Sequence, residues 1–227
     1  MNAQLASVKS ATSIVDARTA WMASQNIPAP LQAAGCVVEM GVGREIFAEG
    51  GDTETFYKVI SGVVRTYRLL SDGRRQIEAF HTSGDVFGFE MGEERSLSAE
   101  AVNDCTMICY RRRNIECLAQ KDHGVSQHLF RIAMQNLAEA QSHSLLLSRR
   151  GAVERVAAFL LAWSRQFGKA RLIPLAMTRQ DIADYLGLTI ETVSRSLSQL
   201  ERDGVIALPG IREVRLNDIA ALQNLAA

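Results

Sequence analysis

Short β-rich runs punctuated by glycine fill the first half of the chain. Runs such as VVRTYRLL (63–70) alternate apolar and polar positions, which is typical of strands that bury one face. Asp72-Gly73 lies between this run and RRQIEAF (74–80) and indicates a hairpin, because a type I′ turn needs positive φ at its centre. The pattern predicts a compact antiparallel β-roll, or jelly-roll, over residues 36–121.

The apolar period changes to three and four residues between positions 122 and 150, which predicts one long helix. Small residues on its apolar row suit the close approach of another helix, and one small β-roll does not need so long a helix to cover it. We therefore expect a dimerisation helix; the alternative is a helix packed only on its own domain. The expected dimer row is Leu129, Ala133, Leu137, Ala140, Ser144 and Leu147.

The two ends of the chain have other textures. Residues 1–35 are rich in Ala and Ser and are interrupted by Pro28 and Pro30, so we expect a helical or flexible segment there. At the other end, Gly151 precedes an amphipathic helix and a short extended piece, RLIPLA. Residues 151–227 are expected to form a separate domain.

Residues 178–206 predict two short helices joined by a glycine turn. Thr178, followed three residues later by Asp181, is typical of a capping box. Gly187 can end the first helix, because glycine adopts positive φ without a Cβ clash, and Thr189 can cap the second. The positions expected to face inward are Ile182, Ala183, Leu186, Val193, Leu197 and Leu200.

The outward face of the second helix carries short polar groups and one arginine, namely Glu191, Thr192, Ser194, Arg195 and Ser198. A helix that enters the major groove needs such side chains, since arginine can grip guanine bidentately and glutamate can accept from cytosine. Two helices with a glycine turn also occur in proteins that never bind DNA. The caps, the polar outer face and the hairpin that follows together favour a winged helix-turn-helix.

The hairpin is expected in IALPGIREVRL (206–216), with its turn at Pro209-Gly210, and Arg212 and Arg215 in reach of phosphates. Residues 151–227 hold nine basic and eight acidic side chains, so a single domain would bind DNA weakly. A dimer doubles the phosphate contacts. The residues expected to contact the DNA backbone are Thr178, Arg179, Thr189, Thr192, Ser198 and Arg212.

Composition narrows the class further. The chain has 227 residues with 25 basic and 25 acidic side chains, and 47% of its residues are hydrophobic, which excludes wholesale disorder. The longest apolar run, Val156–Trp163, is too short to span a bilayer, and the first residues lack a signal-peptide pattern. The four cysteines form no disulfide framework, so we expect a protein of the reducing cytoplasm.

The glycine-punctuated β-roll, the long helix and the C-terminal winged helix resemble the CRP/FNR superfamily of bacterial transcription regulators. QDIADYLGLT followed by Glu191-Thr-Val-Ser194-Arg195 resembles the FNR and FixK branch, as does SDGRRQIEAFHTSGDVFGFE. The resemblance implies that Glu191, Ser194 and Arg195 read a TTGA-type half-site of an inverted repeat. It also implies a homodimer on double-stranded DNA that contacts RNA polymerase and activates genes of microaerobic respiration or nitrogen fixation.

The cysteines depart from the FNR pattern. FNR holds an oxygen-sensitive iron–sulfur cluster through an N-terminal group of cysteines, whereas residues 1–35 contain none. Cys36 cannot replace the missing ligands, because such clusters need four thiolates. Cys36, Cys105, Cys109 and Cys117 are expected to be buried small hydrophobic residues, and no metal site is expected.

A cyclic-nucleotide-gated regulator is the alternative within the same fold. Glu90 and Arg95-Ser96 echo the phosphate-binding cassette of that branch, and an arginine there could clamp a cyclic phosphate. Only four residues separate Glu90 from Arg95, which leaves little room for the short helix of the cassette. The alternative without a ligand is that Arg95 forms a surface salt bridge with Glu93 or Glu94.

The remaining candidate residues point less clearly to a ligand or a reaction. His81 is a conceivable haem ligand at a strand end, and Arg111–Arg113 is interpreted as a solvated strand end. No GxSxG, Walker A or HExxH motif is present, so an enzyme is not expected. The sequence therefore predicts an α+β, FixK-like transcription regulator without a cofactor. The alternative from another functional class is a cyclic-nucleotide-binding regulatory module that acts on a protein and not on DNA.

Overall fold

The computed structural model describes residues 27–149, 151–168 and 170–226. Most of the predicted N-terminal segment, residues 1–26, lies outside the described part. By its internal contacts the chain divides into two units, of which one comprises Met1–Val64 with His81–Asn136. The other comprises Arg65–Phe80 with Leu137–Ala227.

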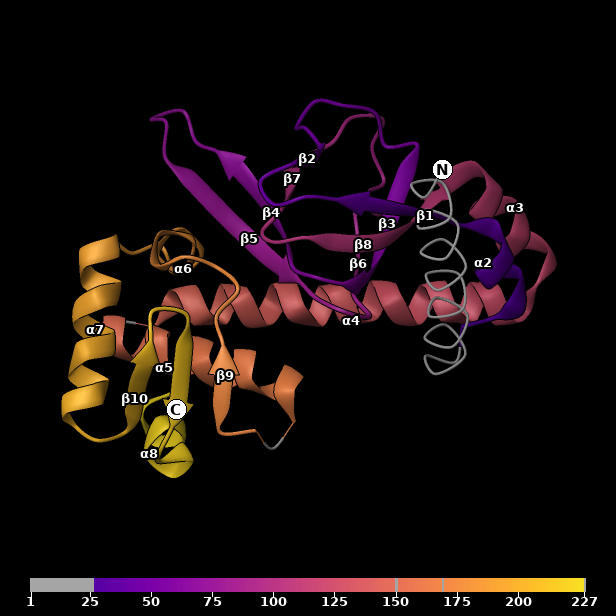
Figure 1. The fold of residues 1–227 in the computed structure, drawn as a ribbon. Helices are drawn as coiled ribbons and strands as arrows, with labels where there is room; N and C mark the ends of the chain where they lie inside the picture. Colours follow the sequence, from indigo (N-terminus) through magenta and orange to yellow (C-terminus); the bar gives the residue numbers. More distant parts are fainter. Residues whose placement is uncertain (1–26, 150, 169, 227) are drawn as a thin grey trace, which may run out of the picture. The chain divides into compact units, whose positions relative to one another are not determined.

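The first unit contains the predicted antiparallel strands (Figure 1). One sheet has the order β1-β8-β3-β6, and a shorter pair joins β2 to β7 in antiparallel register. The strands are β1 (Cys36–Met40), β2 (Glu45–Phe47), β3 (Thr55–Ser61), β6 (Val86–Phe87), β7 (Ser98–Ala101) and β8 (Cys105–Arg111). The predicted β-roll is confirmed for this part of the chain.

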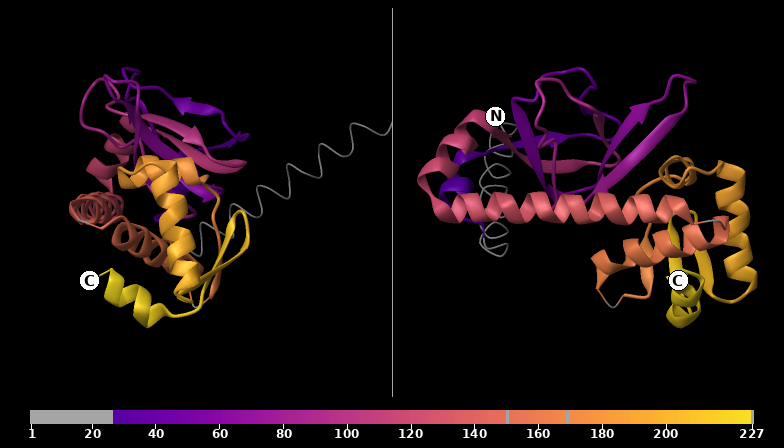
Figure 2. Two further views of the ribbon diagram at one scale, coloured as in Figure 1. Left: turned by 90° about the vertical axis from the view of Figure 1, so that its left-hand side faces the viewer. Right: turned by 180° about the vertical axis from the view of Figure 1, so that it is seen from behind.

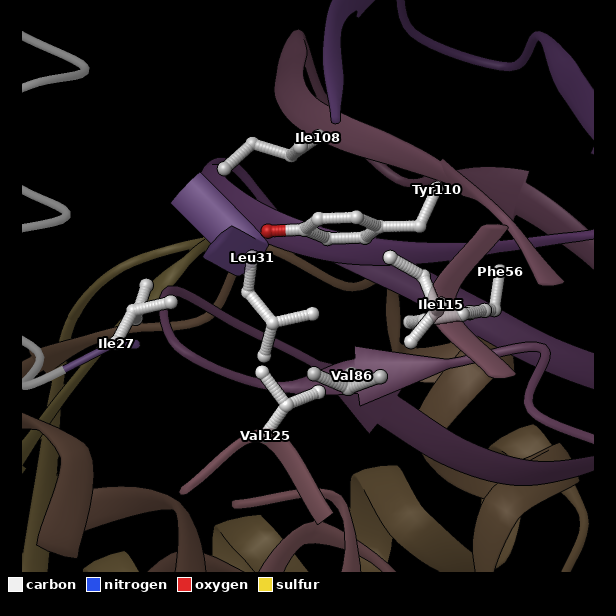
Figure 3. Packing of buried hydrophobic residues seen from close by; sticks show 8 residues of the cluster. All are labelled: Ile27, Leu31, Phe56, Val86, Ile108, Tyr110, Ile115 and Val125. Carbon is white, nitrogen blue, oxygen red and sulfur yellow. The ribbon is translucent and has the colours of Figure 1, made fainter. Parts of the chain in front are cut away.

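Two apolar clusters form the core of the first unit. In one of them, side chains from β3, β6 and β8 meet those of α2 (Ala29–Ala34), α3 (Arg112–Lys121) and α4 (His123–Ser148). Figure 3 shows Leu31 of α2 among Tyr110, Val86 and Val125. The first turns of α4 are thus part of this core, and Leu129 packs against it.

Helix α3 corrects the interpretation of Arg111–Arg113 as a solvated strand end. Arg111 ends β8, but Arg112 begins a helix of 10 residues. Ile115 of this helix is buried, and the Arg112 guanidinium pairs with Glu116 at 2.8 Å, one turn later. Ile115 is buried in the core, and Leu118 and Ala119 of the same helix pack against it. This apolar face stabilises a helix that the three consecutive arginines do not indicate in the sequence.

The second unit contains most of the predicted hairpin of β4 (Val64–Leu69) and β5 (Arg75–His81). Gly73 has positive φ, at 82°, but the expected type I′ turn centred on Asp72-Gly73 is not formed, because the Gly73 amide donates to the Leu70 carbonyl and Ser71 and Asp72 are the central pair. The C-terminal half of α4 also belongs to it. The elements that follow are α5 (Ala152–Ser164), η1 (Arg165–Phe167), β9 (Leu172–Pro174), α6 (Arg179–Leu186), α7 (Ile190–Arg202), β10 (Ile206–Gly210), β11 (Glu213–Leu216) and α8 (Ile219–Leu225). They form the predicted helix-turn-helix with a small sheet (Figure 2).

The sheet of the wing has the order β10-β11-β9, so the extended piece RLIPLA supplies its third strand. The predicted turn at Pro209-Gly210 is wrong, because Gly210 still pairs with Glu213 and the loop consists of Ile211 and Arg212. Pro209 is tolerated within β10 because β10 is an edge strand of this sheet.

Candidate nucleic-acid interface

The start of α6 is held by a reciprocal pair of side-chain bonds. The Thr178 hydroxyl accepts from the Asp181 amide at 3.1 Å, and the Asp181 carboxylate accepts from the Thr178 amide at 2.9 Å. This is the predicted capping box, which satisfies backbone donors that a helix N-terminus leaves open. The box fixes where the first helix of the motif begins.

The turn between the helices depends on Gly187. Its backbone is left-handed, with φ 62° and ψ 40°, and its amide donates to the Ala183 carbonyl. Thr189 then caps α7, because its hydroxyl accepts from the Thr192 amide at 3.3 Å. Both features confirm the predicted sequence of cap, helix, glycine turn and cap.

The predicted inward faces are buried. The exposed fraction of each side chain is 2% or less at Ile182, Ala183, Leu186, Val193, Leu197 and Leu200. Helix α5 lies on the same core, with Phe159, Leu160 and Trp163 buried. The polar face of α7 is therefore the face that remains for solvent or a partner.

Helix α7 carries the expected base readers Glu191, Ser194 and Arg195 and the expected backbone contacts Thr192 and Ser198, and they are exposed to different extents. Glu191, Arg195 and Ser198 are exposed, whereas Thr192 and Ser194 are half-buried. The Glu191 amide and the Thr189 hydroxyl, with a smaller contribution from Arg195, lower the pKa of Glu191. Glu191 is therefore a carboxylate at neutral pH, which can accept a hydrogen bond from a base edge.

The expected backbone contacts lie at the start of α6 and on the wing. Thr178 is exposed, and half-buried Arg179 directs Nη1 to within 3.4 Å of the Ser194 hydroxyl. Arg212 is exposed in the wing turn, and Arg215 is exposed on β11. A helix N-terminus and two arginines are suitable groups for phosphates.

The expected dimer row follows a largely exposed face of α4. Ala133, Leu137, Ala140 and Ser144 are exposed, and Leu129 and Leu147 are half-buried. Large apolar side chains beside this row are also exposed, by 68% at Phe130, 47% at Met134 and 69% at Leu145. An apolar stripe of this kind on a soluble surface is typical of an interaction site.

Glu90, Arg95 and Ser96, which resemble a phosphate-binding cassette in sequence, do not form an open phosphate site in the structure. Arg95 is only 3% exposed, so it is not the surface salt bridge considered above. Its Nη1 donates to the Gly88 carbonyl at 2.6 Å, and its Nη2 donates to the Thr55 carbonyl. Glu90 accepts from both the amide and the hydroxyl of Ser96. Both Nη groups of Arg95 and the Ser96 hydroxyl are engaged within the chain, whereas Arg95 Nε is buried without a hydrogen-bond partner among the described residues.

Burial of the cysteines is only partly as expected. Cys105 is buried and Cys109 is half-buried, and burial raises the pKa of both thiols. Cys36 and Cys117 are exposed, which corrects their description as buried residues. Within residues 27–149, 151–168 and 170–226, no three His, Cys, Asp or Glu side chains come together as metal ligands do.

Two residues that sequence reasoning missed are Arg65 and Arg75 of the β4–β5 hairpin. Both reach the carboxylate of Asp181, the capping residue of α6. Local periodicity contains no signal for an ion pair between residues more than 100 positions apart. A pair of arginines on a strand near a glycine turn could have raised only the general expectation of a charged partner.

The geometry defines a class of protein, a β-roll regulator with a winged helix-turn-helix that binds DNA. The cyclic nucleotide-binding domain family matches residues 37–122, and the Crp-like helix-turn-helix domain family matches residues 154–225. In the described part of the chain, no helix is both long and apolar enough to cross a membrane.

Sequence and structural similarity to FixK proteins shows the family of the chain. The nitrogen fixation regulation protein FixK of Rhizobium meliloti is 44% identical over 198 residues, which cover 87% of this chain and 90% of that protein. FixK of Azorhizobium caulinodans is 47% identical over 186 residues, covering 80% and 75%. The structure of FixK2 from Bradyrhizobium japonicum matches with a TM-score of 0.81 at 44% identity, covering 85% and 98%.

The chain belongs to the CRP/FNR family of transcription regulators and is FixK-like within it. It is a DNA-binding regulator and not an enzyme.

Proposed function

We propose that the chain binds DNA as a homodimer at a TTGA-type inverted repeat and activates genes of microaerobic metabolism or nitrogen fixation. The observation that carries the proposal is the exposed polar face of α7, opposite a fully buried apolar face. The relatives named above as nitrogen fixation regulators support the class of target genes. The cytoplasm is the compartment in which such a regulator acts.

The proposed division of labour follows the sequence. Residues 36–121 form the β-roll, which supports the dimer and contacts RNA polymerase, and residues 122–150 form the dimerisation helix. Residues 151–227 bind DNA. Control by expression level or by a partner protein is consistent with an Arg95 that is engaged by backbone carbonyls.

The proposed contacts separate specificity from affinity. Glu191, Ser194 and Arg195 read base edges, and the expected backbone contacts at α6, α7 and the wing fix the position on the duplex. Helix α7 has 13 residues and a buried apolar side, so its outer face can enter the major groove without disturbing the core. A two-fold dimer would present two such helices about one helical turn of DNA apart.

Arg195→Ala tests the assignment. We expect the variant to lose roughly 1–3 kcal/mol at a duplex with the TTGA inverted repeat and to discriminate less between bases at one position of each half-site. Binding to a random duplex of equal length should change little. Fluorescence anisotropy with both duplexes measures the two affinities.

Arg202→Ala is the matched control, because Arg202 is exposed at the far end of the same helix and carries the same charge. Arg202→Ala should keep the affinity for the specific duplex within about twofold, because Arg202 lies two turns from Arg195 and is expected to contribute only long-range attraction to the phosphates. Equal losses by both variants, or an equal loss by Arg195→Ala on random DNA, would show that Arg195 acts only through its charge.

A further inference from the structure

A cluster of ion pairs around the buried carboxylate of Asp181 joins the β4–β5 hairpin to helix α6 within the second unit. Arg65 Nη1 lies 3.0 Å and Arg75 Nη2 lies 2.5 Å from the same oxygen, Oδ1 of Asp181. Arg75 Nε also donates to Oδ2 of Asp184 at 2.8 Å. These four residues, Arg65, Arg75, Asp181 and Asp184, are called the hairpin clamp below.

Asp181 serves two elements at once. While Oδ1 faces the two arginines, Oδ2 accepts from the amide and the hydroxyl of Thr178 at 2.9 and 2.8 Å. Its side chain is 3% exposed, so its negative charge depends on these donors. The carboxylate that starts α6 is therefore the carboxylate that the hairpin holds.

Aromatic packing extends the contact along α6. The ring of Phe80, near the end of β5, lies 5.3 Å from the ring of Tyr185. Tyr185 also stacks on His143 of α4 at 4.1 Å, and His143 Nε2 lies 2.9 Å from the Tyr185 carbonyl oxygen. The hairpin thus holds α6 at its first turn and again near its last residue.

Movement of α6 would be transmitted to α7. The two helices share a buried face, and Arg179 at the start of α6 reaches the Ser194 hydroxyl on α7 at 3.4 Å. Glu191 and Arg195 stay exposed while the hairpin clamp is closed. The clamp is therefore compatible with an open reading face and does not cover it.

We propose that the hairpin clamp is a positioning device, in which Arg65 and Arg75 set the orientation of α6 and, through it, of α7 on DNA. The idea rests on the proposed function of α7. Arg65 and Arg75 touch no base in this scheme. They act through Asp181 and Asp184, because guanidinium–carboxylate pairs of low exposure fix both distance and direction.

Arg75→Gln opens the Arg75 side of the clamp while Arg65 still pairs with Asp181, and Arg74→Gln is its matched control. Arg74 is adjacent in sequence and carries the same charge, but its side chain is 77% exposed and pairs with Asp72 in the turn. Anisotropy with the TTGA inverted-repeat duplex and with a random duplex gives the ratio of specific to non-specific affinity. We expect Arg75→Gln to lower that ratio roughly tenfold, which is a typical size for the coupling between two sites, here the clamp and the base-reading face of α7. Arg74→Gln should leave the ratio unchanged.

Hydrogen exchange separates positioning from loss of the fold. With the clamp open, amides of residues 179–186 should exchange faster while those of the β-roll core keep their protection. If Arg75→Gln does not fold, Arg75→Lys keeps the charge but loses the fork, and it should show the same selective change at smaller amplitude. Asp184→Ala combined with Arg75→Gln should lose no more than Arg75→Gln alone, since Asp184 belongs to the clamp through Arg75 and Arg75→Gln already removes that contact.

The wild-type chain separates the two proposals. If it does not prefer the TTGA duplex, the proposed function fails whatever the clamp does. If it does, and Arg75→Gln matches Arg74→Gln in affinity ratio and exchange, the clamp is not a positioning device. An increase in specific affinity on opening the clamp would also overturn the proposal, because the hairpin would then restrain the reading helix.

Discussion

The side chain of His81 links the stability of the fold to pH. Burial lowers the pKa of His81 to about 4 from an ordinary value of 6.5, and its ring stacks on Phe87 with centroids 5.0 Å apart. The folded chain therefore takes up this proton later than the unfolded chain as the pH falls. Stability from this group is fully present above pH 6.5 and is lost as the pH falls toward 4.

We expect His81→Gln to flatten that dependence. In the wild type, the free energy of unfolding that His81 contributes and that is lost on acidification amounts to about 2 kcal/mol, once partial exposure of the ring is allowed for. Urea unfolding at pH 7.5 and pH 5 measures it as the difference between the wild type and the variant. His123→Gln is the control, because His123 is exposed on α4. The same pH dependence in the wild type and His81→Gln would mean that another group titrates.

The glycine turn between α6 and α7 carries the next prediction, at the scale of elements. A Cβ at Gly187 would meet nothing closer than 3.8 Å, so a substitution there is opposed by backbone conformation and not by space. Asparagine tolerates left-handed φ, whereas a β-branched residue does not. Gly187→Val should cost about 1–2 kcal/mol more stability than Gly187→Asn, as measured by thermal unfolding. Equal melting temperatures would show that the turn relaxes.

Elements that depend on neighbours in sequence could be predicted, and those that depend on distant partners could not. Thr178, Gly187 and Thr189 fixed both helices of the motif from their spacing, because caps and left-handed turns are local properties. Helix α3 escaped prediction because its single buried residue, Ile115, packs against distant strands. The turn of the wing differs from the prediction because β10 is an edge strand of its sheet, a position that accepts Pro209 within a strand and that the sequence does not reveal.

The candidate site divides in the same way. The outward face of α7 follows from the helical period, so the sequence alone predicts that Glu191 and Arg195 are exposed. Arg65 and Arg75 escaped, because no local pattern indicates that a strand near residue 70 will meet Asp181. Long-range ion pairs arise from the packing of whole elements, and only a three-dimensional structure brings their partners together.

At the scale of the whole molecule, two-fold association should depend on the exposed stripe of α4. Ala133 and Leu137 are exposed in the single chain and lie beside exposed Met134. A glutamate on this stripe would have to be buried without a partner when two helices meet, which is more costly than any gain from packing around it. We therefore expect Ala133→Glu to be a monomer by light scattering at concentrations where the wild type is a dimer.

Gln135→Glu is the matched variant for this test. Gln135 is also exposed on α4, but it is turned from Met134 by about 100° and from Leu137 by about 160°, which places it off the stripe. It should remain a dimer and keep its affinity for the inverted repeat, whereas Ala133→Glu should bind with the weaker affinity of one half-site. If Ala133→Glu stays dimeric, or if both variants dissociate alike, α4 does not bring two copies together through this face. The two reading helices would then need another route to adjacent turns of the duplex.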